Sequence, residues 1–113
     1  MFARVTQFDI DPLAMSMTRA IARFNEQILP SLREQAGYRG VCVLNNEEGR
    51  GLLISYWESE AAAAAALSSG FYDEQVRKFI TFYRQAPGRE QYEVGVFEAP
   101  TGTGLANGKE AVR

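Results

Sequence analysis

The stretch that decides the fold runs from Tyr38 to Trp57, YRGVCVLNNEEGRGLLISYW, and it contains two apolar segments separated by a polar loop. Both segments are rich in β-branched and aromatic residues, which favour strands. The loop, Asn45–Gly49, is polar and ends in glycine, as is typical of a hairpin. Apolar residues stand at nearly every position, so we expect both faces of these strands to be covered. The predicted strands are Tyr38–Asn46 and Arg50–Trp57.

The residues before this hairpin predict a strand and then a helix. Phe2–Ile10 alternates in character and is rich in β-formers, which predicts a strand with two differently used faces. Asp11-Pro12 is a helix-start signal, because Asp caps and Pro is tolerated in the first turn. We expect Pro30 to kink the helix or to mark an irregular last turn, and Gly37 to lie just past the end of the helix. The apolar stripe of this helix comprises Leu13, Met17, Ile21, Phe24, Ile28 and Leu32.

The residues after the hairpin predict two more helical segments and a last strand. Ser59-Glu60 should cap a helix through Ala61–Leu67, and Ser68–Gly70 should end it. A second helix follows, with an apolar side and a stop at Ala86-Pro87-Gly88. The last strand is predicted over Gln91–Ala99. The members of the second helix's apolar side are Phe71, Val76, Phe79, Ile80 and Tyr83.

This order of elements predicts an α+β fold of the ferredoxin-like, split β-α-β-β-α-β kind. Its four-stranded antiparallel sheet carries helices on one face only. The opposite face is also apolar, and a second copy of the sheet is the simplest cover for it. We therefore expect a homodimer joined through the sheets, with residues 1–99 as one domain and residues 100–113 as a flexible tail.

Charge and composition exclude several classes of partner. The net charge is −2 and both signs are interleaved, so no basic stripe exists for nucleic acid. No run approaches the ~20 apolar residues of a membrane span, and the amino terminus lacks a signal-peptide pattern. A single cysteine forms no internal disulfide. The interpretation that follows is a cytoplasmic protein.

The sequence contains no complete set of catalytic or metal-binding residues. Histidine is absent, which removes histidine-based nucleophilic systems, general bases and metal ligands. Cys42 lies in an apolar strand and is best explained as a core residue. Asp9 with Asp11, and Asp73 with Glu74, are best explained as solvated carboxylates. We therefore expect no metal and no tightly held cofactor.

One junction resembles a known family. The predicted strand Arg50–Trp57 ends in Ser55-Tyr56-Trp57 and passes through Glu58-Ser59-Glu60 directly into a helix. This junction resembles the antibiotic biosynthesis monooxygenase domains of the dimeric α+β barrel group. The resemblance extends over residues 2–99 by element order. It implies a homodimer whose sheets pack face to face, with a pocket in each subunit between its sheet and its helices. Members include oxygenases without metal or flavin that act on aromatic substrates, and haem-degrading enzymes.

The haem-degrading members carry an Asn on the first strand, a Trp on the helix after this junction, and a His beyond it. The corresponding positions here are Thr6, Ala66 and Val76. All three residues are replaced, and no histidine is available to bind the iron. The departure from the pattern argues against haem degradation.

Five residues are candidates for the pocket. Thr6 could donate to a substrate oxygen, Trp57 and phenyl rings could stack on a flat ligand, and tyrosines could donate from a helix. The alternative is structural, because an aromatic stripe at helical spacing often forms core and Trp57 could anchor a strand–helix corner. Arg4 could bind an anion or form an ion pair. The candidates are Thr6, Trp57, Tyr72, Phe79 and Tyr83.

These observations lead to two main hypotheses and to a third possibility, in which the barrel serves mainly as an assembly module. The first is a homodimeric, monooxygenase-like enzyme that acts on a small hydrophobic or aromatic metabolite without a cofactor. The alternative is a non-catalytic ligand-binding or stress-response dimer with the same barrel, because fold and function separate readily. Hydroxyl groups of Thr6, Tyr72 or Tyr83 directed at one buried spot would favour the enzyme. A pocket plugged by Phe79 and Phe82 would favour the alternative.

Overall fold

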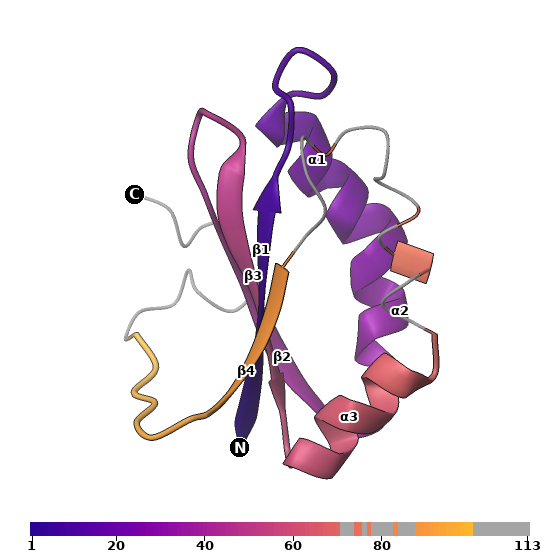
Figure 1. Ribbon diagram of the computed structural model, residues 1–113, viewed down its shortest axis with the longest axis vertical. Helices are drawn as coiled ribbons and strands as arrows, with labels where there is room; N and C mark the ends of the chain where they lie inside the picture. Colours follow the sequence, from indigo (N-terminus) through magenta and orange to yellow (C-terminus); the bar gives the residue numbers. More distant parts are fainter. Residues whose placement is uncertain (71–73, 76, 78–82, 84–87, 101–113) are drawn as a thin grey trace.

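The computed structural model describes residues 1–70, 74, 75, 77, 83 and 88–100. In this part of the chain, four strands form one antiparallel sheet, and the labelled helices lie on one of its faces (Figure 1). The strands are β1 (Phe2–Asp9), β2 (Tyr38–Asn45), β3 (Arg50–Trp57) and β4 (Gly88–Glu93). The helices are α1 (Met17–Arg23), the π-helical turn η1 (Phe24–Ile28), α2 (Leu29–Arg33) and α3 (Glu60–Ser68).

The sheet has the strand order β2-β3-β1-β4, with β1 and β3 in the centre. β1 pairs with β3 over its whole length, from Phe2 opposite Trp57 to Asp9 opposite Arg50. β4 pairs along the other edge of β1, and β2 along the other edge of β3. This is the ferredoxin-like arrangement predicted from the order of elements, and the prediction is confirmed.

The two faces of the sheet carry different side chains. Residues paired across neighbouring strands share a face, so Arg4, Thr6 and Phe8 of β1 lie on the same side as Ser55 and Leu53 of β3. We call this side the helix-facing face. The opposite side, the outer face, is formed by Ala3, Val5, Cys42, Leu52, Ile54 and Tyr56.

The first helix begins later than the sequence predicted. Asp11-Pro12 closes a turn instead, in which the Leu13 N–H donates to Asp11 Oδ1 at 3.0 Å and Leu13 is 96% exposed. Ser16 is the N-cap of α1 and its Oγ accepts the N–H three residues on. Two caps were available, and the later one lets the turn bury Met15 in the core. The predicted start was therefore wrong.

Pro30 does produce the expected irregularity. Upstream of it the helix widens into η1, where the Leu29 N–H donates to the carbonyl of Phe24, five residues back. Pro30 itself lies in the first turn of α2, where its missing N–H is tolerated. A turn wider than 3.6 residues keeps Phe24, Ile28 and Leu32, which are spaced by four, directed at the same cavity.

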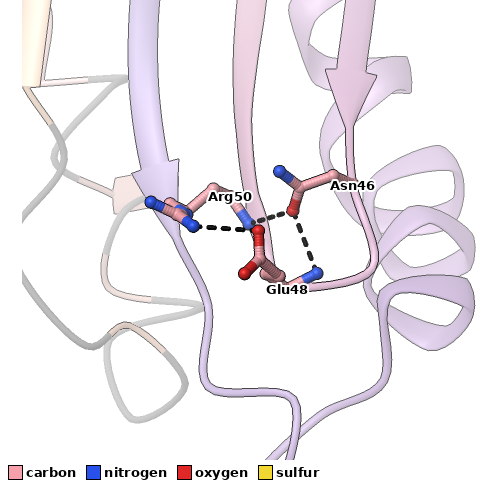
Figure 2. Close-up of polar contacts among 3 residues, drawn as sticks. All are labelled: Asn46, Glu48 and Arg50. Atoms are coloured by element: carbon pink, nitrogen blue, oxygen red, sulfur yellow. Dashed lines mark hydrogen bonds and ion pairs between the residues drawn. The ribbon is translucent and has the colours of Figure 1, made fainter.

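The β2–β3 hairpin is confirmed, and Figure 2 shows the contacts that shape its loop. Asn46 Oδ1 accepts the N–H groups of Glu48 at 3.0 Å and of Arg50 at 3.2 Å, and Arg50 Nη2 donates to Glu48 Oε1 at 2.9 Å. Gly49 has a φ of +90°, and a Cβ there would collide with the carbonyl oxygen of Ile10. The loop end therefore requires glycine.

The β3–α3 corner is also confirmed. Ser59 is the N-cap of α3, and its Oγ accepts the Ala62 N–H at 3.1 Å. Gly37, in the turn between α2 and β2, has a φ of +81° and a carbonyl that accepts the Glu58 N–H at 2.8 Å. A Cβ on Gly37 would press on the methyl group of Ala62. The turn before β2 and the start of α3 are thus packed against each other.

The last strand lies earlier than the predicted Gln91–Ala99. β4 runs over Gly88–Glu93, and the Val94 N–H donates to the Met1 carbonyl at 3.0 Å. Beyond that point β1 has no residues left to pair with, so the alternating pattern continues without a strand. The chain then passes along the side of the sheet away from the helices (Figure 1), and the ring of Phe97 packs edge-on against Tyr56 at 5.4 Å.

Two further predictions fall mainly on residues that the structure does not describe. The second predicted helix, residues 71–85, is represented by Glu74, Gln75 and Arg77, which are helical. The predicted tail lies outside the described residues except for Pro100.

The core consists of two buried clusters on the helix-facing side. One joins the β3–α3 corner to α2, and the other joins the end of β1 to the first helical segment. Leu32, Trp57, Ala63 and Ala66 form the first cluster; Ile10, Met15, Ala20 and Ile28 form the second.

Candidate functional site

A cavity of about 90 Å³, partly open to solvent, lies between the sheet and the first helical segment. Residues of both core clusters line it, so the cavity reaches into the core. Its wall is mainly apolar and comes from α1, η1, α2, β2 and the central strands. The apolar lining residues are Phe8, Ile10, Met17, Ala20, Ile21, Phe24, Ile28, Leu32, Val43 and Leu53.

Polar side chains also reach the lining, and the sheet register brings three of them together. Thr6 of β1 lies directly opposite Arg89 of β4. On its other side Thr6 faces Leu53, and Ser55 is the next residue of β3 on the same face. Thr6, Ser55 and Arg89 therefore form a polar strip on the floor of an otherwise apolar cavity.

Tyr83 and Gln75 complete the polar part of the lining. Tyr83 forms an isolated antiparallel bridge with Ile10, which holds its backbone at the end of β1. Gln75 is helical and only 8% exposed. Its Oε1 atom is buried and has no hydrogen-bond partner in the structure as described.

Burial keeps the Tyr83 phenol protonated at neutral pH. Burial raises the pKa of Tyr83 above its ordinary value of 10, and the positive charge of Arg89 opposes this shift. At neutral pH the phenol is therefore an O–H donor next to a cation. Such a pair can stabilise negative charge on a ligand oxygen.

Trp57 lies outside this cavity. It is 0% exposed, its Nε1 donates to Ser55 Oγ at 2.9 Å, and its ring meets Tyr38 edge-on at 5.9 Å. It packs with Leu32 and Ala63 at the β3–α3 corner. Its contact with the cavity is indirect, because its hydrogen bond orients a serine that does line the site.

Arg4 is also buried on the helix-facing face, but it is not a lining residue of the cavity. It is 1% exposed, and its Nη2 donates to the carbonyl of Ala63 in α3 at 2.8 Å. A guanidinium in this position ties the central strand to the helix above it. This contact is additional to the two roles considered from the sequence, an anion partner and an exposed or interface ion pair.

Of the five predicted pocket residues, the structure brings Thr6 and Tyr83 together in one cavity. It places Trp57 beside that cavity, behind Ser55. Tyr72 and Phe79 lie outside the described residues.

Three polar lining residues, Ser55, Gln75 and Arg89, were not anticipated. Arg89 would have been found from its pairing with Thr6 had the start of β4 been placed correctly. Gln75 stands three residues after Tyr72 and four before Phe79, so helical periodicity alone places it on their side.

Other kinds of site were sought in the described part of the chain. It contains no group of three or more His, Cys, Asp or Glu side chains placed to hold a metal ion. None of its helices has the length and apolar character needed to cross a membrane.

Comparison with protein families gives one match. Residues 1–81 fit the family model described as antibiotic biosynthesis monooxygenase. The match includes β1 to α3 and the polar lining residues Thr6, Ser55 and Gln75. No match was found among curated proteins.

Several solved structures share the fold at low sequence identity. A putative antibiotic biosynthesis monooxygenase from Deinococcus radiodurans superposes with a TM-score of 0.69 at 13% identity, covering 90% of this chain and all of the other. A protein of unknown function from Nitrosomonas europaea gives 0.68 at 19%, with 89% and 95% covered. A monooxygenase of Streptomyces coelicolor in complex with the ligand nanaomycin D gives 0.67 at 15%, with 88% and 92% covered.

Proposed function

The chain belongs to the antibiotic biosynthesis monooxygenase family, and on that premise we propose that it is a monooxygenase-like enzyme for a small hydrophobic or aromatic metabolite. The site is the cavity between the sheet and α1–η1. The observation that carries the proposal is the pairing of an apolar wall with the hydroxyl-bearing side chains of Thr6 and Tyr83 in one buried space.

The chemistry proposed for this site needs no cofactor. An electron-rich substrate loses a proton and its anion reacts with dioxygen; a CH₂ group becomes a carbonyl and water is released. One oxygen atom enters the product and the other enters the water, so the substrate supplies all the electrons. The apolar wall keeps bulk water from the reacting anion, and the protonated Tyr83 and the Arg89 cation stabilise the negative charge on oxygen.

Substrate size bears on the same proposal. The enclosed volume is about 90 Å³, smaller than a cavity of ~150 Å³ known to hold benzene. A ring system therefore has to protrude through the open side or displace part of the wall. Met17 is suited to such movement, because it is half-buried and unbranched.

We further propose that the working unit is a homodimer joined through the outer face. Val5, Leu52, Ile54 and Tyr56 are each partly exposed there, and Leu44 is half exposed. A single chain thus leaves an apolar sheet face in water, which a second copy of the same sheet would cover.

The alternative is a ligand-binding dimer without catalysis. The small enclosed volume and the position of Trp57 outside the cavity favour this reading, because the largest ring of the chain cannot stack on a bound substrate. A fold shared at 13–19% identity does not decide between the two.

Oxygen uptake with 1,8-dihydroxynaphthalene tests the enzyme proposal, because this small electron-rich fused aromatic has a CH₂ group para to the carbonyl in its keto tautomer. We expect dioxygen consumption that depends on the protein, with Thr6→Val and Tyr83→Phe each reducing kcat by about 10-fold to 100-fold. Native mass spectrometry on the same samples reports chains per particle and bound ligand. Binding of the naphthalene without oxygen uptake would support the ligand-binding alternative, and absence of both would contradict the assignment of this cavity.

A further inference from the structure

Gln75 is a buried polar lining residue whose side-chain oxygen has no partner in the described part of the chain. Its side chain lines the cavity and is 8% exposed, yet its Oε1 accepts no hydrogen bond in the described structure. A buried acceptor without a partner destabilises the folded state, and buried polar atoms of this kind are uncommon in native proteins. An apolar residue would fill the same position without that cost.

The other polar groups of the lining are accounted for differently. Ser55 Oγ accepts from Trp57 Nε1 at 2.9 Å. Tyr83 and Thr6 carry hydroxyls, which both donate and accept, and Arg89 only donates. Among the polar groups of the lining, the amide oxygen of Gln75 is the one that accepts hydrogen bonds and cannot donate them.

From this we infer that Gln75 is the residue that selects ligands carrying a hydrogen-bond donor, an O–H or N–H on an apolar body. The inference rests on the proposed function, because it assumes that the ligand occupies this cavity. The donor of the ligand satisfies Gln75 Oε1, while its apolar body lies against Phe24, Ile28 and their neighbours.

Such an acceptor discriminates in a predictable way. A ligand with a donor gains the hydrogen bond, whereas a ligand of the same size without one leaves the acceptor buried and unpaired. Removing the acceptor should abolish this preference and leave apolar binding intact. It should also stabilise the unliganded protein, because the unpaired atom is gone.

A matched pair of probes tests this directly. Phenol and toluene have the same number of heavy atoms and are both neutral at pH 7, so attraction of an anion to Arg89 plays no part. Binding is followed by NMR titration of the full-length protein. We expect wild type to bind phenol about tenfold more tightly than toluene, and aniline to share the preference.

The variants are Gln75→Leu and, in case branching disturbs the fold, the unbranched Gln75→Met. Each should bring the phenol-to-toluene ratio close to one, retain toluene binding and raise the melting temperature of the unliganded protein. Gln91→Leu, an exposed change on β4, is the control and should leave the ratio unchanged.

The other outcomes distinguish a wrong role for Gln75 from a wrong proposed function. If both probes bind and the wild-type ratio survives in the Gln75 variants, or is lost only in Thr6→Val, the role of Gln75 is overturned while the cavity assignment stands. If both probes bind equally to wild type, the role is overturned as well. If neither probe nor dihydroxynaphthalene binds, the proposed function itself fails.

Discussion

The two faces of the sheet reverse the usual distribution of polar and apolar residues. The helix-facing face is covered, yet it carries Arg4, Thr6 and Ser55, all of them buried. The outer face carries no helix of the described chain, although Phe97 packs on Tyr56 there, and it leaves Val5 and Ile54 partly exposed among other apolar residues. In a sheet without a functional site or a partner, the face covered by helices would be apolar and the face exposed to water would be polar. The difference supports two of the proposals made above, a site on the helix-facing face and a second chain on the outer face.

The largest effect is expected from Arg4, the buried cation of the helix-facing face. Arg4→Ala should lower the free energy of unfolding by about 4 kcal/mol, because it removes both the hydrogen bond to the Ala63 carbonyl and a buried side-chain volume. Arg4→Met preserves most of the volume and should cost about half as much. Urea denaturation measures both values. A loss below 1 kcal/mol for Arg4→Ala would mean that Arg4 does not anchor α3.

The next largest effect concerns the outer face. Ile54→Arg places a charge in the middle of the apolar surface and should weaken dimerisation by about 3 kcal/mol, which is more than 100-fold in dissociation constant. Sedimentation velocity at micromolar concentration is the measurement.

The matched control for Ile54→Arg is Leu13→Arg, at a leucine that is 96% exposed and lies outside the sheet, in the turn before α1. It should leave the dimer intact. A wild-type protein that sediments as a compact monomer would contradict the outer-face proposal altogether.

A smaller effect should come from adjacent residues that point to opposite faces. Val5→Thr adds a hydroxyl to the outer face and should weaken dimerisation by about 1 kcal/mol while leaving ligand binding unchanged. Thr6→Val removes a hydroxyl from the cavity and should do the reverse, reducing ligand binding without affecting the dimer. Sedimentation and ligand titration on both variants test this exchange. If both variants weakened dimerisation and ligand binding to the same extent, the two faces would not have separate roles.

The smallest effect is the pH dependence of protein stability that comes from Tyr83, beside the helix-facing face. Burial raises the pKa of Tyr83 in the folded protein above its ordinary value of 10. The stabilisation linked to the neutral phenol is therefore complete below pH 10 and is lost as the pH rises through the folded-state pKa. Wild type should lose stability more steeply than Tyr83→Phe between pH 9 and 11, as measured by urea denaturation. Equal slopes would place Tyr83 in water.

The predictable part of the fold depended on local signals. The hairpin at Asn46, the cap at Ser59 and the irregularity at Pro30 were all predicted correctly, because each depends on residues within one turn of the chain. The start of α1 was misplaced because Asp11 and Ser16 are both competent caps, and the choice between them depended on burying Met15. The end of β4 was misplaced because it depends on where its partner strand runs out.

The sequence by itself determined the order of the elements, the apolar character of both sheet faces and the absence of histidine chemistry. These follow from composition and from periods of two and about 3.6 residues, which are local properties of the chain. Tertiary structure alone decided which polar residues meet. Thr6 is far along the chain from Gln75 and Arg89, and pairing and packing place all three around one cavity. The tertiary structure also places Trp57 outside that cavity, where its indole N–H donates a hydrogen bond to Ser55 Oγ.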